Sequence, residues 1–444
     1  MISAITVPTP ELGDRSYLIH DGTAGAVIDP QRDTDRLIDA AAAGGIDIVC
    51  VAETHVHNDY VSGGWALAQS LGVPYLVAAA EEVAFDRLAV HDGDEIPLAP
   101  GFSLRVVATP GHTPHHVTYV ALDGGCPVLA CTGGSLLFGS VGRTDLLGAD
   151  LAEPLARQQY RSVLSLGHLP GAVEVLPTHG FGSFCAAGTA TSDASTIEEQ
   201  RRVNRAFVAP GEDAFVAALL RDFVDYPRYY QRMAPHNRRG APPPDLAPPP
   251  DLAGERLAAM AAGGSWVVDL RDRAAFAAAH IEGSISLPQE TPFTTYLGWL
   301  LPEDTPLVLM AETPSAIALA QRDLARIGVD AVAGRYAGAF PPAGAAGAVR
   351  SYPVRRFADL REAMRTDGGL ALDVRRDDEW ERGHLDRALH VPLHDLEDRI
   401  GTLPPGTLWV HCGAGYRASI ASSLLARRGR EVVLIDDRFA NAHA

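Results

Sequence analysis

The chain has 444 residues, of which 47% are hydrophobic and 21% charged, so we expect about three globular domains with ordinary cores. Its formal net charge is −18, because 55 acidic residues outnumber 37 basic ones, and this excludes nucleic acid and anionic membrane surfaces as partners. No apolar run approaches the roughly 18 residues of a transmembrane helix, so no membrane span is expected.

The cysteines and the first residues predict where the protein resides. Cys50, Cys126, Cys131, Cys185 and Cys412 are odd in number and lack the spacing of a disulfide framework. In so long a chain this pattern predicts reduced thiols and a cytoplasmic location. The opening residues MISAITVPTPELGD lack a charged segment followed by an apolar one, so no signal peptide is expected.

Residues 1–232 are predicted to form a domain rich in strands. The apolar stretches SYLIH, AGAVIDP and IDIVCVA come first, and SLRVVA, HHVTYVAL and CPVLACTGG follow. This density of short strands favours a sheet-rich α/β sandwich over a doubly wound sheet.

Ligand-type side chains follow three of these predicted strands. The segment ETHVHNDY places His55, His57 and Asp59 at alternate positions of an extended loop, so their side chains can converge. TPGHT supplies His112 after LRVVA, and LPTHG supplies His179 after EVL. Three such loops at strand ends are typical of a metal site, so these five residues are the candidate ligands.

Other residues near these loops are given simpler roles. His115 and His116 are expected at the solvated start of a strand, with a place in the lining of a substrate pocket as the alternative for either one. Cys131 and Cys185 lie beside the candidate metal loops, but neither is followed by a glycine- and arginine-containing loop. We therefore expect both to be buried structural thiols, which behave as small hydrophobic residues.

Proline-rich sequence divides the rest of the chain. Residues 233–252 are expected to be an extended linker, because proline runs are excluded from the interiors of helices and strands. A second, weaker break is rich in Gly, Ala and Pro at 341–354. The remaining sequence forms two smaller predicted domains, residues 253–345 and 351–440.

The two smaller domains look like copies of one another. Each has an apolar strand that ends in Asp-x-Arg, which is VVDLR (267–271) in the first and ALDVR (371–375) in the second. A short helix with an aromatic residue follows in both, and then a histidine. Alternating short strands and helices predict a parallel sheet covered on both faces, here present twice.

The segment WVHCGAGYRAS (409–419) is the most specific local signal. A strand runs directly into Cys412, and a helix-forming run follows Arg417. Backbone N–H groups and a helix N-terminus favour a thiolate here, and with Arg417 they can hold an anionic sulfur donor. Such a thiolate attacks an activated sulfur and carries it as Cys–S–S−. The candidate catalytic residues are therefore Cys412 and Arg417, and the persulfide-binding loop is Gly413, Ala414, Gly415 and Tyr416.

Residues 353–440 resemble a rhodanese, or sulfurtransferase, domain on the strength of the Asp-Val-Arg strand end and the loop CGAGYR. A phosphatase loop would place its arginine six residues after the cysteine, whereas Arg417 lies five after Cys412. The earlier copy also resembles a rhodanese, but its loop reads AETPSA, with Glu312 where the cysteine would stand. Without a nucleophile we expect that copy to be catalytically silent.

Residues 3–210 resemble the metallo-β-lactamase fold, in the branch that contains glyoxalase II and the persulfide dioxygenases. The three histidine loops and GSVGRTDLLG (139–148) carry this resemblance. It implies an αββα sandwich followed by two rhodanese-like α/β domains, an order similar to persulfide dioxygenase–sulfurtransferase fusions. In such fusions one Fe(II) and O2 oxidise a low-molecular-weight thiol persulfide to sulfite, and the rhodanese joins sulfane sulfur to sulfite or another acceptor.

Two residues depart from the pattern of this family. Tyr60 replaces the last histidine of its T-H-x-H-x-D-H motif, which removes a ligand of a second metal. Gly134 replaces the aspartate of Thr-Gly-Asp-Thr-Leu, which in persulfide dioxygenases completes a two-histidine, one-carboxylate set on Fe(II). The ligands that remain for one metal are His55, His57 and His112, with Asp59 or Asp145 as a substitute carboxylate.

The sequence is compatible with three functions. The first is a persulfide dioxygenase-like domain coupled to a sulfurtransferase at Cys412, acting on a thiol persulfide, thiosulfate or sulfite. The second is a zinc thioester hydrolase like glyoxalase II, with the same sulfurtransferase. The third is a metal-free sulfur-relay protein in which only Cys412 is active. Self-association into a homo-oligomer is left open.

Overall fold

The computed structural model describes residues 1–188, 192–290, 292–366 and 368–443. The chain forms two compact units. The first consists of Met1–Asp245 and Asp323–Gly328, and the second of Leu246–Arg322 and Val329–Ala444. None of the helices in the described ranges has the length and apolarity needed to cross a membrane.

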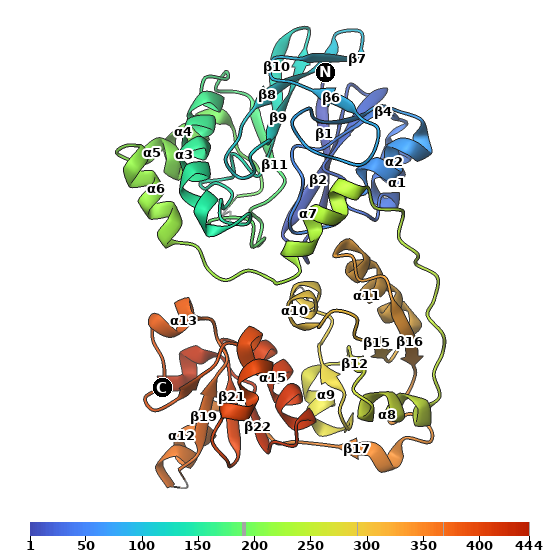
Figure 1. Cartoon of the computed structure of the whole chain (residues 1–444), viewed down its shortest axis with the longest axis vertical. Coiled ribbons are helices and arrows are strands. Elements are labelled where there is room, and N and C mark those ends of the chain that lie inside the picture. The colour runs from blue at the N-terminus through green and yellow to red at the C-terminus, as the bar shows by residue number, and fades with distance from the viewer. Residues whose placement is uncertain (189–191, 291, 367, 444) are drawn as a thin grey trace. The chain divides into compact units, whose positions relative to one another are not determined.

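The first unit is a sandwich of two sheets with helices on both outer faces (Figure 1). A six-stranded mixed sheet has the order β1-β2-β3-β4-β5-β6, and a five-stranded sheet has the order β11-β10-β9-β8-β7. The strands are β1 (Ser3–Thr9), β2 (Asp14–His20), β3 (Ala24–Ile28), β4 (Asp47–Ala52), β5 (Tyr75–Ala78), β6 (Leu88–Val90), β7 (Glu95–Ala99), β8 (Phe102–Ala108), β9 (Val117–Asp123), β10 (Cys126–Gly133) and β11 (Glu174–Pro177).

The helices of this unit form two groups, one on each sheet, and a last helix follows them near the end of the unit. They are α1 (Asp35–Gly44), α2 (Gly64–Leu71), α3 (Ala149–Leu166), α4 (Ile197–Val203), α5 (Arg205–Val208), α6 (Glu212–Arg221) and α7 (Tyr230–Arg239). Helices α1 and α2 cover the six-stranded sheet, and α3 to α6 lie on the side of the five-stranded sheet (Figure 1). This arrangement confirms the predicted αββα sandwich.

Alternation along the strands builds three apolar layers. In β2, Tyr17 and Ile19 face the core between the sheets, whereas Leu18 packs under α1 and α2. In β9, Tyr119 faces the same central core and Val120 packs towards α3. A strand with both faces covered needs apolar residues at every position, which explains why the sequence reads as continuous apolar stretches.

The predicted linker begins later in the structure than in the sequence interpretation. Residues 233–239 belong to α7, whose Asn237 donates from Nδ2 to the backbone oxygens of His57 and Tyr60 and accepts from the Ser62 N–H. A polar side chain that satisfies three backbone groups of the histidine loop makes this helix part of the first unit. Extended, proline-rich chain follows from residue 241.

The second unit contains two parallel sheets, as predicted from the duplication. The earlier has the order β14-β12-β15-β16, with a short antiparallel pair of β13 and β17, and the later has the order β18-β22-β21-β19-β20. The strands are β12 (Trp266–Asp269), β13 (His280–Ile281), β14 (Ile285–Ser286), β15 (Leu307–Ala311), β16 (Val332–Ala337), β17 (Val349–Arg350), β18 (Val354–Arg355), β19 (Leu370–Asp373), β20 (Leu389–His390), β21 (Leu408–His411) and β22 (Val432–Ile435).

Helices connect these strands in both copies (Figure 1). They are α8 (Gly254–Ala262), α9 (Arg273–Ala278), α10 (Phe293–Leu300), α11 (Pro314–Arg326), α12 (Phe357–Thr366), α13 (Asp377–Glu381), α14 (Leu396–Arg399) and α15 (Tyr416–Arg427). Short 3-10 helices are η1 (Ala346–Ala348), η2 (Leu393–Asp395), η3 (Ile400–Thr402) and η4 (Phe439–His443).

The duplication extends to individual contacts. Arg271 bonds Asp269 through Nε and NH2 at 3.0 and 2.6 Å, and Arg375 bonds Asp373 at the same two distances. Each guanidinium also lies over an aromatic ring, at 3.7 Å in the first copy and 3.6 Å in the second. A buried aspartate at the strand end needs such a partner, so the Asp-x-Arg signature marks a structural ion pair in both copies.

Candidate functional site

The candidate ligands of the first unit come together at one end of the sandwich. His55, His57 and Asp59 lie in the loop after β4, His112 in the loop after β8, and His179 directly after β11. All five side chains are buried, with at most 2% of any residue exposed. The three loops therefore converge as the sequence analysis expected, although their role as metal ligands stays a prediction.

Imidazole rings pack closely around His55. Its ring centroid lies 4.1 Å from that of His57, 4.8 Å from that of His112 and 5.3 Å from that of His179. Among the described residues, His179 belongs to three groups whose donor atoms lie within 4.8 Å of one another. The groups are His55, His57 and His179; His112, His179 and Cys185; and Asp14, Asp59 and His179. His179 therefore lies nearer the centre of the cluster than is expected from a one-metal ligand set of His55, His57 and His112.

Hydrogen bonds fix Nδ1 of His55 and of His112, whereas His57 has carboxylates beside its Nε2. His55 Nδ1 lies 2.8 Å from Thr54 Oγ1, and His112 Nδ1 donates to the Arg143 carbonyl at 2.7 Å. His57 Nε2 lies 3.1 Å from Glu53 and 3.3 Å from Asp29. Within the described part of the chain, His57 Nδ1 and His112 Nε2 are buried and have no hydrogen-bond partner.

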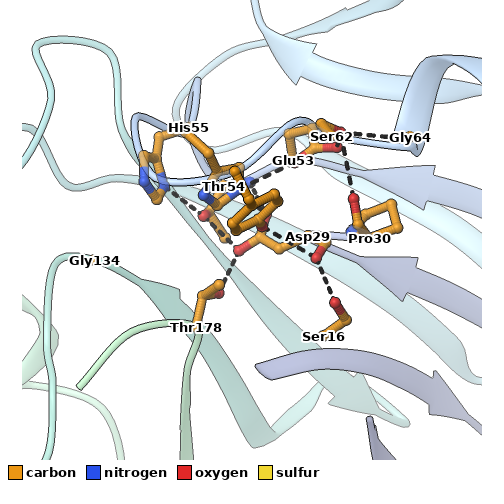
Figure 2. A network of polar contacts seen from close by, with 12 residues as sticks. Ser16, Asp29, Pro30, Glu53, Thr54, His55, Ser62, Gly64, Gly134 and Thr178 are labelled. Atoms are coloured by element: carbon orange, nitrogen blue, oxygen red, sulfur yellow. Dashed lines mark hydrogen bonds and ion pairs between the residues drawn. The ribbon is translucent and has the colours of Figure 1, made fainter. Parts of the chain in front are cut away.

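Asp29 anchors this arrangement from below the cluster (Figure 2). Its carboxylate accepts the Thr54 N–H at 2.7 Å, the Thr54 hydroxyl at 2.7 Å and the Thr178 hydroxyl. Because Thr54 donates to Asp29, its oxygen accepts from His55 Nδ1–H, which leaves His55 Nε2 with a lone pair. Asp29 has a φ of 51°, which is strained for a residue with a side chain and is typical of functional sites.

Glu53 extends the same network on the other side of His57. Its Oε1 accepts from the Tyr75 hydroxyl at 3.0 Å. It also accepts from the Ser62 hydroxyl, and Ser62 Oγ accepts the Gly64 N–H at 3.0 Å (Figure 2). Burial raises the pKa of Glu53. Burial alone would lower the pKa of His57, but the carboxylates of Asp29 and Glu53 raise it to about 9.

A second pair of carboxylates faces His179. Its Nδ1 lies 2.8 Å from Asp14 Oδ1 and 3.1 Å from Asp59 Oδ2. Burial opposes a charge on His179, yet Asp59 and Asp14 raise its pKa well above the usual value. Burial and the neighbouring Asp59 raise the pKa of Asp14 to about 7. The other nitrogen, His179 Nε2, lies 3.3 Å from His55 Nε2.

Sequence reasoning missed several residues of this site. His116 is 1% exposed rather than solvated, and it accepts the Gly134 N–H on Nε2 at 3.0 Å while its Nδ1 bonds Thr109. Asp14, Asp29 and Glu53 lie at strand ends far apart in the sequence. Asp14 is the first residue of β2, Asp29 directly follows β3 and Glu53 directly follows β4, and these positions were the available signal.

Gly134 lies against His112. A Cβ atom on Gly134 would come within 2.1 Å of His112 Cδ2 and 2.7 Å of His112 Nε2. The imidazole therefore occupies the space that a carboxylate side chain at position 134 would cross. The departure from the family pattern at Gly134 is thus accompanied by a close approach of one candidate ligand.

These residues fit a divalent transition metal. Buried imidazole nitrogens without protein partners are costly unless a ligand satisfies them, and the buried carboxylates supply negative charge beside them. The hydrogen bonds from the other nitrogens to carbonyl, hydroxyl and carboxylate groups are the outer contacts that metal-binding histidines usually have. His55, His57, His112 and His179 are the residues that would hold it.

The cysteine loop of the second unit has the predicted strand–loop–helix geometry. Cys412 follows β21 directly, is 2% exposed, and accepts the Gly415 N–H on Sγ at 3.2 Å. Gly415 precedes α15 with a φ of 90°, and a Cβ there would lie 2.1 Å from Asp436 Oδ1. Only glycine fits this position, so the loop can close around the sulfur at the helix N-terminus.

Arg417 is already bound by a carboxylate. Its Nη1 and Nη2 lie 2.5 and 2.7 Å from the two oxygens of Glu379, a residue of α13 that was not predicted from the sequence. Burial opposes the charge, but the bonds to Glu379 raise the pKa of Arg417 further above its usual range. Arg417 thus enters the site as an oriented, partly neutralised cation.

The earlier copy contributes to the surroundings of this loop. The Tyr416 hydroxyl donates to the Pro288 carbonyl at 3.0 Å, and the Tyr296 and Tyr416 rings lie 5.9 Å apart. In the earlier copy itself, α11 begins only two residues after Glu312, whereas α15 begins four residues after Cys412. The shorter connection leaves no loop like residues 412–415.

Comparisons with known proteins agree with this architecture. The Metallo-beta-lactamase superfamily matches residues 11–179, and the Rhodanese-like domain matches residues 253–341 and 357–441. The chain is 31% identical to the human persulfide dioxygenase ETHE1, mitochondrial, over 44% of its own length and 68% of the relative's. It is 33% identical to a hydroxyacylglutathione hydrolase of Cupriavidus taiwanensis over 39% of its length and 66% of that relative's.

Among solved structures, a metallo-beta-lactamase from Staphylococcus aureus subsp. aureus COL aligns with a TM-score of 0.68 and 27% identity. The alignment covers 76% of this chain and 99% of that one, which is more than a single domain could account for. The chain belongs to the metallo-beta-lactamase superfamily, as a member with persulfide dioxygenase relatives and two additional rhodanese-like domains.

Proposed function

We propose that this chain is a two-site enzyme of sulfur metabolism. The metal-binding histidine cluster of the first unit oxidises a low-molecular-weight thiol persulfide, and Cys412 transfers sulfane sulfur between a donor and an acceptor. The rhodanese-like domains and the persulfide dioxygenase relatives support the general role. The contact of the Gly415 N–H with Cys412 Sγ, at the start of α15, is the observation that carries the transfer site.

Sulfur transfer at Cys412 balances without a cofactor. The thiolate attacks the sulfane sulfur of thiosulfate, a new S–S bond forms, and the old S–S bond breaks so that sulfite leaves with the electron pair. The product Cys–S–S− is an anion, and the Gly415 N–H that contacts Sγ at the start of α15 is suited to hold it. Arg417, held in place by Glu379, supplies positive charge for the incoming dianion.

Persulfide oxidation would require a bound metal. One persulfide, one O2 and one water give one thiol and one sulfite, and an Fe(II) ion supplies the oxygen chemistry when it is bound. The protein's part is to hold the imidazoles in one tautomer through Thr54 and Arg143 and to keep the site dry through burial. Because Gly134 offers no carboxylate, the identity of the metal depends on the other ligand-type residues of the site.

One observation disfavours a two-metal thioester hydrolase. Tyr60 stands where the family has a second-metal histidine, and its hydroxyl donates to the Asp29 carbonyl at 3.2 Å while its ring stacks on His57 at 4.3 Å. A phenol tied to a backbone carbonyl is a poor ligand for a second ion. We therefore favour persulfide oxidation over thioester hydrolysis.

Two variants of the full chain separate the two proposed reactions. Cys412→Ser should abolish thiosulfate:cyanide sulfur transfer but keep persulfide-dependent O2 uptake, because the histidine cluster is unchanged. His112→Ala should do the reverse. Transfer that survives Cys412→Ser would refute the cysteine assignment, and O2 uptake that survives His112→Ala would refute the metal site.

A further inference from the structure

Cys185 lies beside two histidines of the cluster and is not part of the expected ligand set. Its thiol and the nitrogens of His112 and His179 lie within 4.8 Å of one another, and all three residues are buried. No part of Cys185 is exposed. Its position, eight residues after the end of the core strand β11 and two after Ser183, gives it no place in the alternating apolar pattern of a strand.

Both histidines have one nitrogen committed to the protein. His112 Nδ1 donates to the Arg143 carbonyl, so Nε2 carries the lone pair, and this atom is buried without a partner among the described residues. His179 Nδ1 faces Asp14 and Asp59, and its Nε2 lies 3.3 Å from His55 Nε2, so a metal ion at Nε2 would replace this contact between the two imidazoles. An orphaned imidazole nitrogen beside a second imidazole and a thiol is the arrangement that a borderline-soft cation satisfies.

The backbone of Arg143 connects Cys185 and His112 through one hydrogen bond to each residue. Its carbonyl accepts from His112 Nδ1 at 2.7 Å, and its N–H donates to the Cys185 carbonyl at 2.8 Å. The Cys185 N–H in turn donates to Ser183 Oγ at 3.2 Å. The Arg143 side chain is pinned by Asp145 at 2.7 Å. Thiol and imidazole are therefore held on one rigid frame, as the ligands of a metal site must be.

We propose that His112, His179 and Cys185 form a two-nitrogen, one-sulfur site for a divalent transition metal such as Zn²⁺ or Fe²⁺. This inference deepens the proposed function, because it adds a thiolate to the histidines that would hold the metal of the first unit. Binding displaces the thiol proton to solvent and forms a metal–thiolate bond, with no change in oxidation state. The thiolate supplies the anionic donor that Gly134 lacks.

Cobalt(II) tests this site by a signal that does not depend on activity. The full chain with Cys412→Ser serves as the parent, so that the reactive thiol cannot bind cobalt. Cobalt bound to a thiolate gives a charge-transfer absorption in the near ultraviolet, whereas cobalt bound to nitrogen and oxygen alone gives only the visible bands. We expect the charge-transfer absorption in the parent, its loss in Cys185→Ser and its retention in Cys131→Ser, a matched buried cysteine of the central core.

The outcomes separate this inference from the proposed function. Visible bands without charge transfer in the parent, or charge transfer that persists in Cys185→Ser, would overturn the thiolate ligand and leave the histidine site standing. Failure of the parent to bind cobalt would overturn both. X-ray absorption of the zinc-loaded parent needs no variant at Cys185, and one sulfur neighbour at about 2.3 Å is expected there. A zinc shell without sulfur would contradict the proposal.

Discussion

The imidazole of His112 is packed between two glycines. A Cβ on Gly134 would lie 2.1 Å from His112 Cδ2, and a Cβ on Gly142 would lie 2.6 Å from His112 Nδ1. The ring is also bonded to the Arg143 carbonyl, so it cannot move away without losing that contact. Any side chain at position 134 must therefore displace a candidate metal ligand.

Two variants at position 134 separate the effect of an added carboxylate from the effect of added bulk beside His112. Gly134→Ala and Gly134→Asp both push on His112, but only aspartate adds an anionic ligand. We predict that the aspartate variant retains more iron per chain than the alanine variant when metal content is measured by plasma mass spectrometry. Equal iron contents in the two variants would show that position 134 does not face the metal.

Glu379 is expected to restrain the affinity of the cysteine site for anions. Its carboxylate neutralises Arg417 and repels a dianionic donor, so Glu379→Gln should lower the KM for thiosulfate by about fivefold, or about 1 kcal/mol. Steady-state transfer assays would measure the change. Glu381→Gln, on the same helix but exposed, is the control and should leave the KM unchanged. A higher KM in Glu379→Gln would mean that Arg417 needs Glu379 for its position.

A cysteine alone should not activate the earlier rhodanese-like copy. Helix α11 begins at Pro314, so a thiol at position 312 would lack the four-residue loop that brings the Gly415 N–H to Cys412 Sγ. We predict no measurable thiosulfate:cyanide transfer by a Glu312→Cys, Cys412→Ser double variant. Activity above that of Cys412→Ser would show that the loop contributes little.

Acid should weaken the second unit through His411, which is buried beside Cys412. Burial, with Arg375 and His390 nearby, lowers the pKa of His411 to about 4 against an ordinary value of about 6.5. The folded state therefore resists a proton that the unfolded chain accepts. The resulting stability is complete above about pH 6.5 and is lost as the pH falls towards 4, by about 3 kcal/mol.

Chemical denaturation of the full chain at pH 7 and pH 4.5 would measure this effect, followed by fluorescence of tryptophans in the second unit. In His411→Asn the loss on acidification should be smaller, because the titrating group is gone. An equal loss in the variant and in the parent would assign the acid sensitivity to other groups.

Much of the fold could be predicted from local sequence patterns. Short apolar stretches gave the strands, and the repeated Asp-x-Arg gave two copies whose Arg271 and Arg375 ion pairs match in distance. The end of the first domain was harder to predict from the sequence. Its α7 carries Pro235, and the Asn237 side chain that ties this helix to the first unit bonds a loop 180 residues away in the sequence.

The histidine loops were predictable because each follows a strand, but their supporting carboxylates were not. Asp29 and Glu53 reach His57 only once β3 and β4 lie side by side. His116 read as solvated because nothing local indicates that the Gly134 N–H would bind it. Glu379 was not predicted because its partner, Arg417, lies 38 residues further along the sequence.

Intact mass spectrometry of the full chain shows whether Cys412 carries sulfur as a persulfide. After incubation with thiosulfate and rapid desalting, we predict a gain of one sulfur atom on the parent chain, removed by cyanide and absent in Cys412→Ser. A gain that persists in Cys412→Ser, or no gain in the parent, would contradict the account.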